Sequence, residues 1–347
     1  MPDDPSQEPG PQEPGPRLDL SWRSAWIAAA VVVALVAVFA LAVWVLGSPG
    51  GSPAGAPSSS GPSVVTAPTS SAPTGGHRHH HHRIKDPLQP VTIHQDPTCP
   101  IRPPHILRVM QFNIHAGVSR YGGVGLARIA AEIKAAHPDL VSLNEVDSGT
   151  IRSGRADEAA YLGRATGLRA VYGPNLFGYD GGRFGNAILS RYPIRETHNT
   201  RLPRKPGSEP RGLLGVTLRV GRQTVSFYSV HLSQGGRGAA QRVRQAGAIA
   251  RVIRSSGHPT ILSGDLNARP GDLPVRILRQ YLLDAQEQAG TGPGLTVPEG
   301  DPQHRIDYIL YDNHFGAVPD STQVLPSGSS DHRSVWTELV LRPKGQC

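Results

Sequence analysis

Four apolar segments of this 347-residue chain each end in a side chain that can bind a metal ion or move a proton. They end at Asn113, Glu145, His231 and the pair formed by Asp265 and Asn267. Asp265 and Asn267 are two residues apart, so in an extended chain both side chains would point to the same side. These side chains are candidates for a shared site.

Two further elements of this kind lie nearer the C-terminus. Asp307 stands within an apolar run, and Ser330, Asp331 and His332 directly precede the last apolar run. One acid at the end of a strand usually belongs to a capped turn, but six such elements in one region favour a common site. Ser330, Asp331 and His332 cannot form a nucleophilic triad by themselves, because consecutive residues do not converge on one point.

The residue types in this set select a chemistry. Carboxylates and amides without thiolates favour a hard cation held by oxygen, such as Mg²⁺ or, as an alternative, Mn²⁺. Two histidines beside spare acids can polarise a phosphoryl group and carry out acid–base steps. The chain contains no GxxxxGK[ST] phosphate loop and no HExxH zinc helix. It also contains no GxSxG nucleophile elbow.

Short apolar runs must position these residues. Their spacing predicts strands over 106–113, 140–145, 186–190, 213–220, 224–231, 259–262, 305–311 and 334–341. Apolar residues at helical spacing predict helices over 125–137, 239–256 and 272–282. Many strands with scattered helices predict an α+β fold in which two sheets pack face to face.

Seven sequence strings make the region similar to a known family. In chain order they are QFNIH, LNEVD, GNAILSRYPI, VHLS, GDLNARP, RIDYIL and SDHRSV. Together they resemble the endonuclease/exonuclease/phosphatase superfamily, the metal-dependent phosphoesterases with the fold of pancreatic deoxyribonuclease. The resemblance covers about 107–341. It implies a four-layer α/β/β/α sandwich of two packed, mostly antiparallel sheets, with the site at one edge between them.

The resemblance also implies a role for each matching residue. Glu145 is expected to be the main Mg²⁺ ligand, with Asn113 and Asp331 helping in the metal shell. Asp265 is expected to orient or deprotonate the attacking water. In-line attack on phosphorus needs such a water, and it needs neutralisation of the charge that grows on the equatorial oxygens.

Four more matching residues are implied to act on the phosphate. Asn267, His231 and His332 are expected to hold the scissile group. Asp307 is expected to pair with one histidine, fixing its tautomer and stabilising its charge. The acidic partner of the other histidine is not apparent from the sequence.

Two residues have supporting assignments. Asn186 matches the family's Gly-Asn strand and is expected to support the site. Arg211 could contact a phosphate or be a surface loop arginine. Family nucleases reach substrate with aromatic and acidic residues between the second and third strands, and the corresponding stretch here does not align clearly. It holds Tyr172, Tyr179, Asp180 and Arg183.

The first 98 residues differ in composition. We expect 1–23 to be a disordered cytoplasmic tail, 24–46 a transmembrane helix, 47–98 a Gly/Pro/Ser/His-rich linker and 99–347 the catalytic domain. The 21 uncharged residues of 26–46 are long enough to span a hydrocarbon core of ~30 Å. A signal peptide has an apolar region of only ~7–15 residues. Arg17 and Arg23 precede the span and no Lys or Arg follows it until Arg78, which places the C-terminal part outside.

The net charge and the cysteine count limit the possible binding partners and disulfide bonds. Residues 99–347 hold 30 Lys and Arg against 20 Asp and Glu, a net charge of about +10 that would attract nucleic acid, anionic lipid or cell-wall polymers. An arginine-heavy solvated surface is the plainer interpretation. Two cysteines exclude a disulfide scaffold, although Cys99 and Cys347 could bridge, since the implied fold makes the first and last strands neighbours. The histidine tract at 77–82 could bind metals or be a low-complexity accident.

These observations predict a membrane-anchored, extracytoplasmic, Mg²⁺-dependent phosphoric-ester hydrolase of the cell membrane. Its substrate would be a lipid headgroup or a small phosphoester, because a tether holds the domain near a bilayer. A surface nuclease acting on DNA is the alternative that the charge favours. A catalytically inactive phosphate-binding module is a third, which the complete set of acids, amides and histidines argues against. We expect a monomer and infer no protein partner.

Overall fold

The computed structural model describes residues 104–118 and 125–343, all of which belong to one compact unit. No helix within those two ranges combines the length and the apolar character needed to cross a membrane. The predicted membrane span at 24–46, the linker at 47–98, and Cys99 and Cys347 lie outside the described residues.

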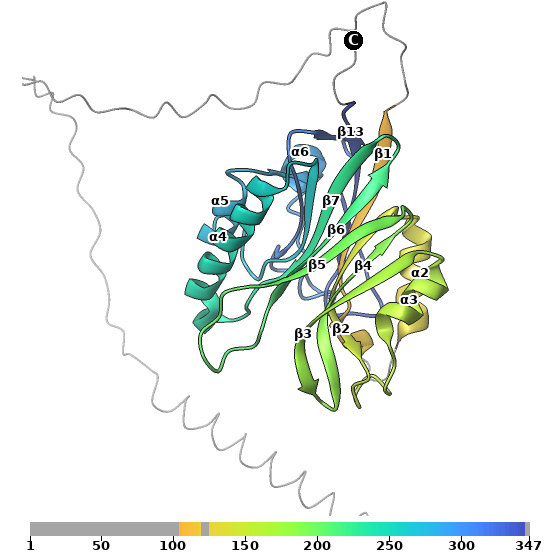
Figure 1. Cartoon of the computed structure of the whole chain (residues 1–347), viewed down its shortest axis with the longest axis vertical. Helices are drawn as coiled ribbons and strands as arrows, with labels where there is room; N and C mark the ends of the chain where they lie inside the picture. The colour runs from red at the N-terminus through yellow and green to blue at the C-terminus, as the bar shows by residue number, and fades with distance from the viewer. Residues whose placement is uncertain (1–103, 119–124, 344–347) are drawn as a thin grey trace, which may run out of the picture. The chain divides into compact units, whose positions relative to one another are not determined.

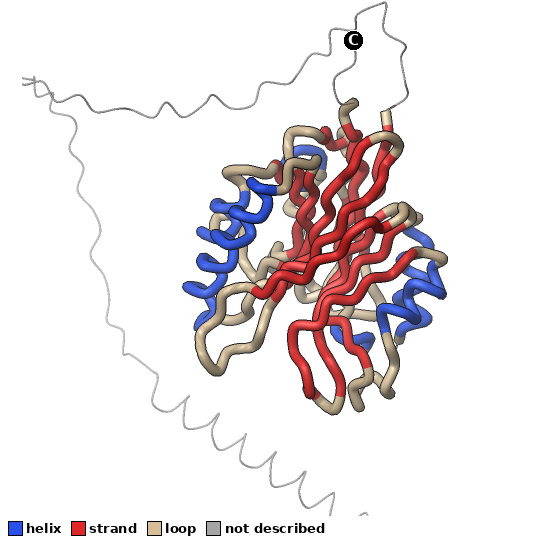
Figure 2. Tube along the Cα trace, in the orientation of Figure 1, coloured by secondary structure: helices blue, strands red, loops and turns tan. Residues whose placement is uncertain are grey.

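Strands dominate the described chain (Figures 1 and 2). The strands are β1 His105–Asn113, β2 Leu140–Ser148, β3 Arg169–Tyr179, β4 Gly182–Ser190, β5 Ile194–Arg201, β6 Gly212–Val220, β7 Gln223–His231, β8 Thr260–Asp265, β9 Leu283–Asp284, β10 Asp307–Tyr311, β11 Phe315–Ala317, β12 Gln323–Leu325 and β13 Ser334–Leu341. The helices are η1 His115–Gly117, α2 Leu126–Ala136, α3 Glu158–Thr166, η2 Gly236–Gly238, α4 Ala239–Ser255, α5 Leu273–Leu278 and α6 Ala285–Ala289.

The strands form two sheets. One has the order β11-β13-β1-β2-β4-β3, with β12 also paired to β13, and the other has the order β5-β6-β7-β8-β10-β9. Only the β1–β2 and β7–β8 pairs of these described strands are parallel. A buried cluster that includes Leu140, Leu214 and Phe227 joins the two sheets. The predicted pair of packed, mostly antiparallel sheets is therefore confirmed.

Helices cover the outer face of each sheet (Figure 1). Ile129 of α2 packs in one cluster with Phe112 of β1, while Ile249 of α4 packs in another with Leu262 of β8. Burying these apolar stripes against the sheets is what stabilises amphipathic helices of this length. The layers run helix, sheet, sheet, helix.

The ends of the domain lie side by side. Strand β1 pairs antiparallel with β13, with His105 opposite Leu341. The expectation that the first and last strands are neighbours is thus confirmed.

Several elements differ from the sequence prediction. Strands β3 and β5 were not predicted, and both lie at sheet edges. Edge strands bury little apolar surface, and Pro174 within β3 is tolerated there because an edge strand needs fewer backbone donors. Helix α3 was also missed, and α5 is shorter than the predicted 272–282. Strand β10 begins at Asp307 rather than at 305.

The two-residue period of the strands builds the site. In β1, Leu107 and Val109 face the cluster between the sheets, whereas Met110 and Phe112 face the helices. Side chains alternate along a strand, so Gln111 and Asn113 continue the inner face. The inner faces of β2, β7 and β8 change in the same way, from Leu140, Phe227 and Ile261 to polar residues. The inter-sheet core is therefore apolar at one end and polar at the other.

Candidate active site

Strand register brings the predicted residues to the polar end of the inter-sheet space. Asn113 pairs with Asn144 across β1 and β2. Asp265 pairs with His231 on one side and with Asp307 on the other. Residues from five strands therefore meet at one edge, although 194 positions separate Asn113 from Asp307 in the sequence.

Glu145 owes its orientation to an irregularity in β2. The pairing of β2 with β4 shifts between Leu143 and Val146, and Glu145 has a φ of 57°. A bulge of this kind locally re-aims a side chain. Asn113 Nδ2 donates to Glu145 Oε1 at 3.0 Å and to Asp265 Oδ2 at 3.1 Å. The amide thus links two carboxylates that belong to different sheets.

Asp265 is the buried centre of the site. Its Oδ1 accepts the backbone N–H of Asn267 at 2.8 Å, and its own N–H donates to Asn144 Oδ1 at 2.9 Å. Asn267 has a φ of 47°, so the prediction of extended chain here is wrong. The chain turns after β8, because the short side chain of Asp265 accepts a hydrogen bond from the backbone N–H two residues later. Burial and the charge of Asp307 raise the pKa of Asp265 to about 7, although His332 opposes the shift.

His332 and Asp307 form a close pair. His332 Nδ1 lies 2.8 Å from Asp307 Oδ2, and His332 Nε2 lies 3.9 Å from Asp265 Oδ2. Burial alone would lower the pKa of His332, but the charge and hydrogen bond of Asp307 raise it to about 10. The imidazole is therefore held as a cation at neutral pH, with Nε2 turned toward Asp265.

His231 has a basic neighbour instead of an acidic one. Arg211 Nη1 lies 2.7 Å from His231 Nδ1. A guanidinium can only donate, so the neutral ring carries its proton on Nε2, which lies 3.4 Å from the acceptor Asp265 Oδ2. Asn267 Nδ2, itself a donor, lies 2.9 Å from the same nitrogen and donates to the carbonyl of Leu232 at 3.1 Å. Burial, Arg211 and His332 lower the pKa of His231 well below its usual value. His231 is therefore neutral, whereas His332 is a cation.

Arg211 lies behind His231 rather than on the surface. Only 4% of the residue is exposed, and its Nη2 lies 3.3 Å from Glu209 Oε1. This placement answers one question that the sequence left open, because His231 Nδ1 is bound by Arg211 and no acid takes that position. The surface-loop interpretation of Arg211 is wrong.

A buried amide network supports the site, and sequence analysis missed its centre. Asn144 Nδ2 donates to Asn186 Oδ1 and to the carbonyl of Val230, both at 3.0 Å. Gln111 Nε2 donates to Asn144 Oδ1 at 2.7 Å and to Asp307 Oδ1 at 3.3 Å. Both residues are fully buried. Both residues could have been found from the sequence, because each is a polar residue at an inward-facing position of an otherwise apolar strand.

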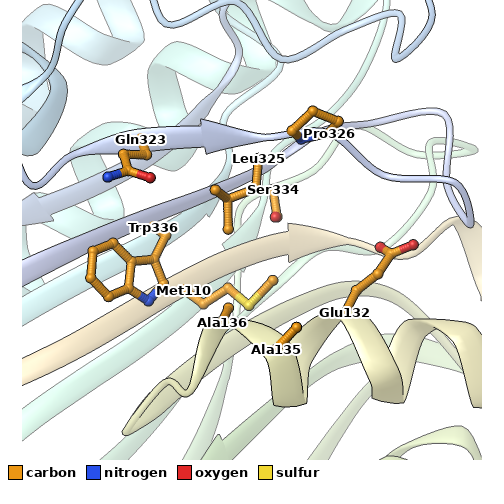
Figure 3. Close-up of a pocket in the computed structure, with 9 residues that line it drawn as sticks. All are labelled: Met110, Glu132, Ala135, Ala136, Gln323, Leu325, Pro326, Ser334 and Trp336. Carbon is orange, nitrogen blue, oxygen red and sulfur yellow. The ribbon is translucent and has the colours of Figure 1, made fainter.

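The loop that carries Asp331 and His332 is held from two sides. Ser330 Oγ donates to the carbonyl of Asn113 at 2.6 Å and accepts the N–H of His332 at 3.2 Å. On the other side, Glu132 of α2 accepts three hydrogen bonds from the loop, from Ser327 Oγ, Gly328 N and Ser329 Oγ. Glu132 also lines a pocket of about 440 Å³ together with Met110 and Trp336, and Figure 3 shows it on its helix at one side of that pocket. Helix α2 thus positions the loop that carries Asp331 and His332.

The donor chemistry of the site fits a hard divalent cation. Glu145 forms no ion pair with any described residue, and its one hydrogen-bond donor there is the Asn113 amide. The Asp331 side chain is 46% exposed and lies 3.7 Å from His115 Nδ1. Mg²⁺ takes carboxylate oxygens as ligands, and these two carboxylates have little or no cationic partner to compete for them.

A second acidic group lies deeper. One ligand atom from each of Asp265, Asp307 and His332 falls within 4.8 Å of the others. His332 is already bound to Asp307, so these atoms are less free than those of Glu145 and Asp331. The carboxylates of Glu145 and Asp331 are therefore the freer of the two groups to take a cation.

The chain is similar to known proteins. Residues 110–332 match the model of the Endonuclease/Exonuclease/phosphatase family. The chain is 26% identical to YbhP of Escherichia coli, an uncharacterised protein, over 67% of this chain and 96% of that protein. It is 34% identical to the inositol phosphosphingolipids phospholipase C of Saccharomyces cerevisiae, over 46% of this chain and 45% of that enzyme.

Solved structures give the same result. The crystal structure of an endonuclease/exonuclease/phosphatase from Beutenbergia cavernae superposes with a TM-score of 0.58 at 26% identity, over 68% of this chain and 72% of that chain. The human Nocturnin catalytic domain superposes with a TM-score of 0.54 at 22% identity, over 68% of this chain and 93% of that chain. The second likeness concerns the fold alone.

Proposed function

The chain belongs to the endonuclease/exonuclease/phosphatase family of phosphoester hydrolases, and on this basis we propose a Mg²⁺-dependent hydrolase that cleaves phosphoric esters of lipid headgroups or small molecules at a membrane. One observation carries the proposal. The buried carboxylate of Asp265 lies between the neutral His231 and the cationic His332. It also accepts a hydrogen bond from the Asn113 amide, which donates to Glu145 as well. This arrangement suits proton transfer beside a phosphoryl group.

The proposed reaction begins with water near Asp265. Asp265 accepts a proton from the water as its oxygen attacks phosphorus, and the ester oxygen departs and takes up a proton from solvent to become an alcohol. A base whose pKa lies near the working pH is efficient in such a step. The Asn113 and Asn267 hydrogen bonds fix the carboxylate that does this.

The remaining groups stabilise the phosphoryl oxygens. His332 offers a positive charge that Asp307 holds in place, and His231 offers the N–H of Nε2 because Arg211 occupies Nδ1. Preorganised donors of this type stabilise charge that develops in the transition state. Glu145, with Asn113 and Asp331 nearby, would hold Mg²⁺, which when bound supplies Lewis-acid neutralisation of the phosphoryl oxygens.

Two features support a membrane setting for this hydrolase. The apolar run at 26–46 has the length of a membrane span, and the relative that shares 34% identity is an inositol phosphosphingolipids phospholipase C. We therefore propose single-pass anchoring with the catalytic domain outside the cytoplasm. The net charge of about +10 on 99–347 favours DNA as the second candidate substrate.

A side-by-side assay tests the proposal. The full chain, reconstituted in vesicles with Mg²⁺, would be given bis-p-nitrophenyl phosphate, sphingomyelin, phosphoinositides and plasmid DNA, with Asp265→Asn as the blank. We expect cleavage of bis-p-nitrophenyl phosphate and of a lipid. Preferred cleavage of DNA with a rate that falls steeply as salt rises would identify a nuclease, because counterion release governs such binding. No cleavage of any of the four would contradict the hydrolase assignment.

A further inference from the structure

A cluster of exposed apolar side chains lies on the β3–β4 hairpin and the loop that follows β2. Six large hydrophobic side chains of the described ranges are exposed, and three of them are here: Ile151 at 61%, Phe177 at 59% and Tyr179 at 39%. Arg155 and Arg183 lie on the same loop and hairpin, and neither forms an ion pair with a described residue. We call these five residues the hairpin patch.

The loop is fastened to the hairpin by specific contacts. The N–H of Ile151 donates to the carbonyl of Asp180 at 2.9 Å, and the N–H of Arg152 donates to Asp180 Oδ2 at 2.7 Å. The Arg152 guanidinium lies 4.9 Å from the ring centroid of Tyr179 and binds buried Asp147 at 2.7 Å. The exposed apolar groups are therefore presented on a braced surface.

The hairpin patch lies close to the candidate active site. Ser148 of β2 pairs with Arg183 of β4, and Ser148 follows Glu145 by three residues. Three residues span at most about 10 Å, the length of a fully extended strand. Figure 1 shows the hairpin projecting at the end of the first sheet, where β2 also ends. Whatever the patch binds is thus held next to the phosphoryl site.

We propose that the hairpin patch inserts into the interfacial region of a lipid bilayer and presents the active site to lipid phosphates. The inference rests on the proposed hydrolase function and names where its substrate lies. Aromatic rings favour the membrane interface, and apolar side chains flanked by arginines are typical of surfaces that lie in the headgroup region. Arg155 and Arg183 can bind lipid phosphate oxygens there.

A bilayer fits these residues better than a nucleic acid does. Phe177 and Tyr179 offer rings, but Ile151 is the most exposed apolar side chain of the patch, and its aliphatic group gives a base nothing to stack on. The chain also carries the apolar run of 26–46, which would keep the domain within reach of a bilayer. DNA binding at this surface is the competing outcome of the test.

Tryptophan quenching tests insertion without relying on catalysis. The full chain carrying Phe177→Trp would be reconstituted in vesicles with brominated acyl chains, and Tyr281→Trp would serve as the control. Tyr281 is 40% exposed and stacks near Arg254, outside the patch. After subtraction of the wild-type signal, we expect at least half of the added fluorescence of Phe177→Trp to be quenched and little of that of Tyr281→Trp. Equal quenching of both, or of neither, would overturn the proposal.

Activity measurements separate this inference from the proposed function. In the double variant Ile151→Ser with Phe177→Ser, we expect cleavage of lipid in vesicles to fall at least tenfold and cleavage of bis-p-nitrophenyl phosphate to stay within twofold. If the wild type cleaves neither substrate, the proposed function fails, while the quenching result still decides the patch. If the double variant loses DNA binding and Phe177→Trp is not quenched, the surface binds nucleic acid and the proposal is wrong.

Discussion

Asp265→Asn is expected to lower kcat for phosphoester hydrolysis by about 10²–10⁴-fold, the usual contribution of a general base. The substitution keeps the shape of the side chain and its ability to accept the Asn267 N–H. It removes the group that accepts the proton of water, at a site where burial and Asp307 hold the pKa near neutrality. Steady-state rates on bis-p-nitrophenyl phosphate measure the effect.

A matched variant controls for damage to the fold. Asp139→Asn makes the same change in another buried acid, one that binds Arg108 and Arg191 just before β2. We expect it to lower thermal stability and to change kcat only a few-fold. If Asp265→Asn retained more than a tenth of the wild-type kcat while folding normally, Asp265 would not be the base.

His332→Ala is expected to cause a second loss of about 10²–10⁴-fold. The imidazole is the one cationic side chain that lies within 4 Å of the Asp265 carboxylate among the described residues. Its charge depends on Asp307, which binds Nδ1 at 2.8 Å. Removing the ring takes away both the charge and the donor offered to the phosphoryl oxygens.

A double-mutant cycle tests whether the pair acts as one unit. Asp307→Asn alone should also lower kcat, since the remaining amide cannot stabilise the imidazolium. Residues that work together give strongly non-additive effects. The combination of His332→Ala with Asp307→Asn should therefore be no slower than His332→Ala alone. Multiplying losses would show that Asp307 acts independently of His332.

The sequence predicted the strand ends well, because each central strand is a short apolar run with a polar terminus. The inward alternation of β1 is visible in its letters, since Leu107 and Val109 share a parity with Gln111 and Asn113. The same rule would have found Gln111, and applied to β2 it would have found Asn144. The edge strand β5 was missed because seven of its eight residues are exposed. Such a strand has no alternating apolar pattern that the sequence could reveal.

Other features depend on tertiary contacts that no local pattern encodes. The bulge that re-aims Glu145 arises from a register shift between β2 and β4. The contact of Arg211 with His231 Nδ1 joins residues 20 positions apart, and no pattern in the sequence indicates it. The hold of Glu132 on the loop of His332 spans nearly 200 positions. Each arises because distant strands and helices pack side by side.

Metal removal and return is the most direct test of a metal-assisted hydrolase at this site. The wild-type full chain would be assayed on bis-p-nitrophenyl phosphate with Mg²⁺, after chelation by EDTA, and after Mg²⁺ is restored in excess. We predict that activity disappears with EDTA and returns with Mg²⁺, and that Glu145→Gln needs far more Mg²⁺ to reach its half-maximal rate. Hydrolysis that continues unchanged in EDTA would contradict the account.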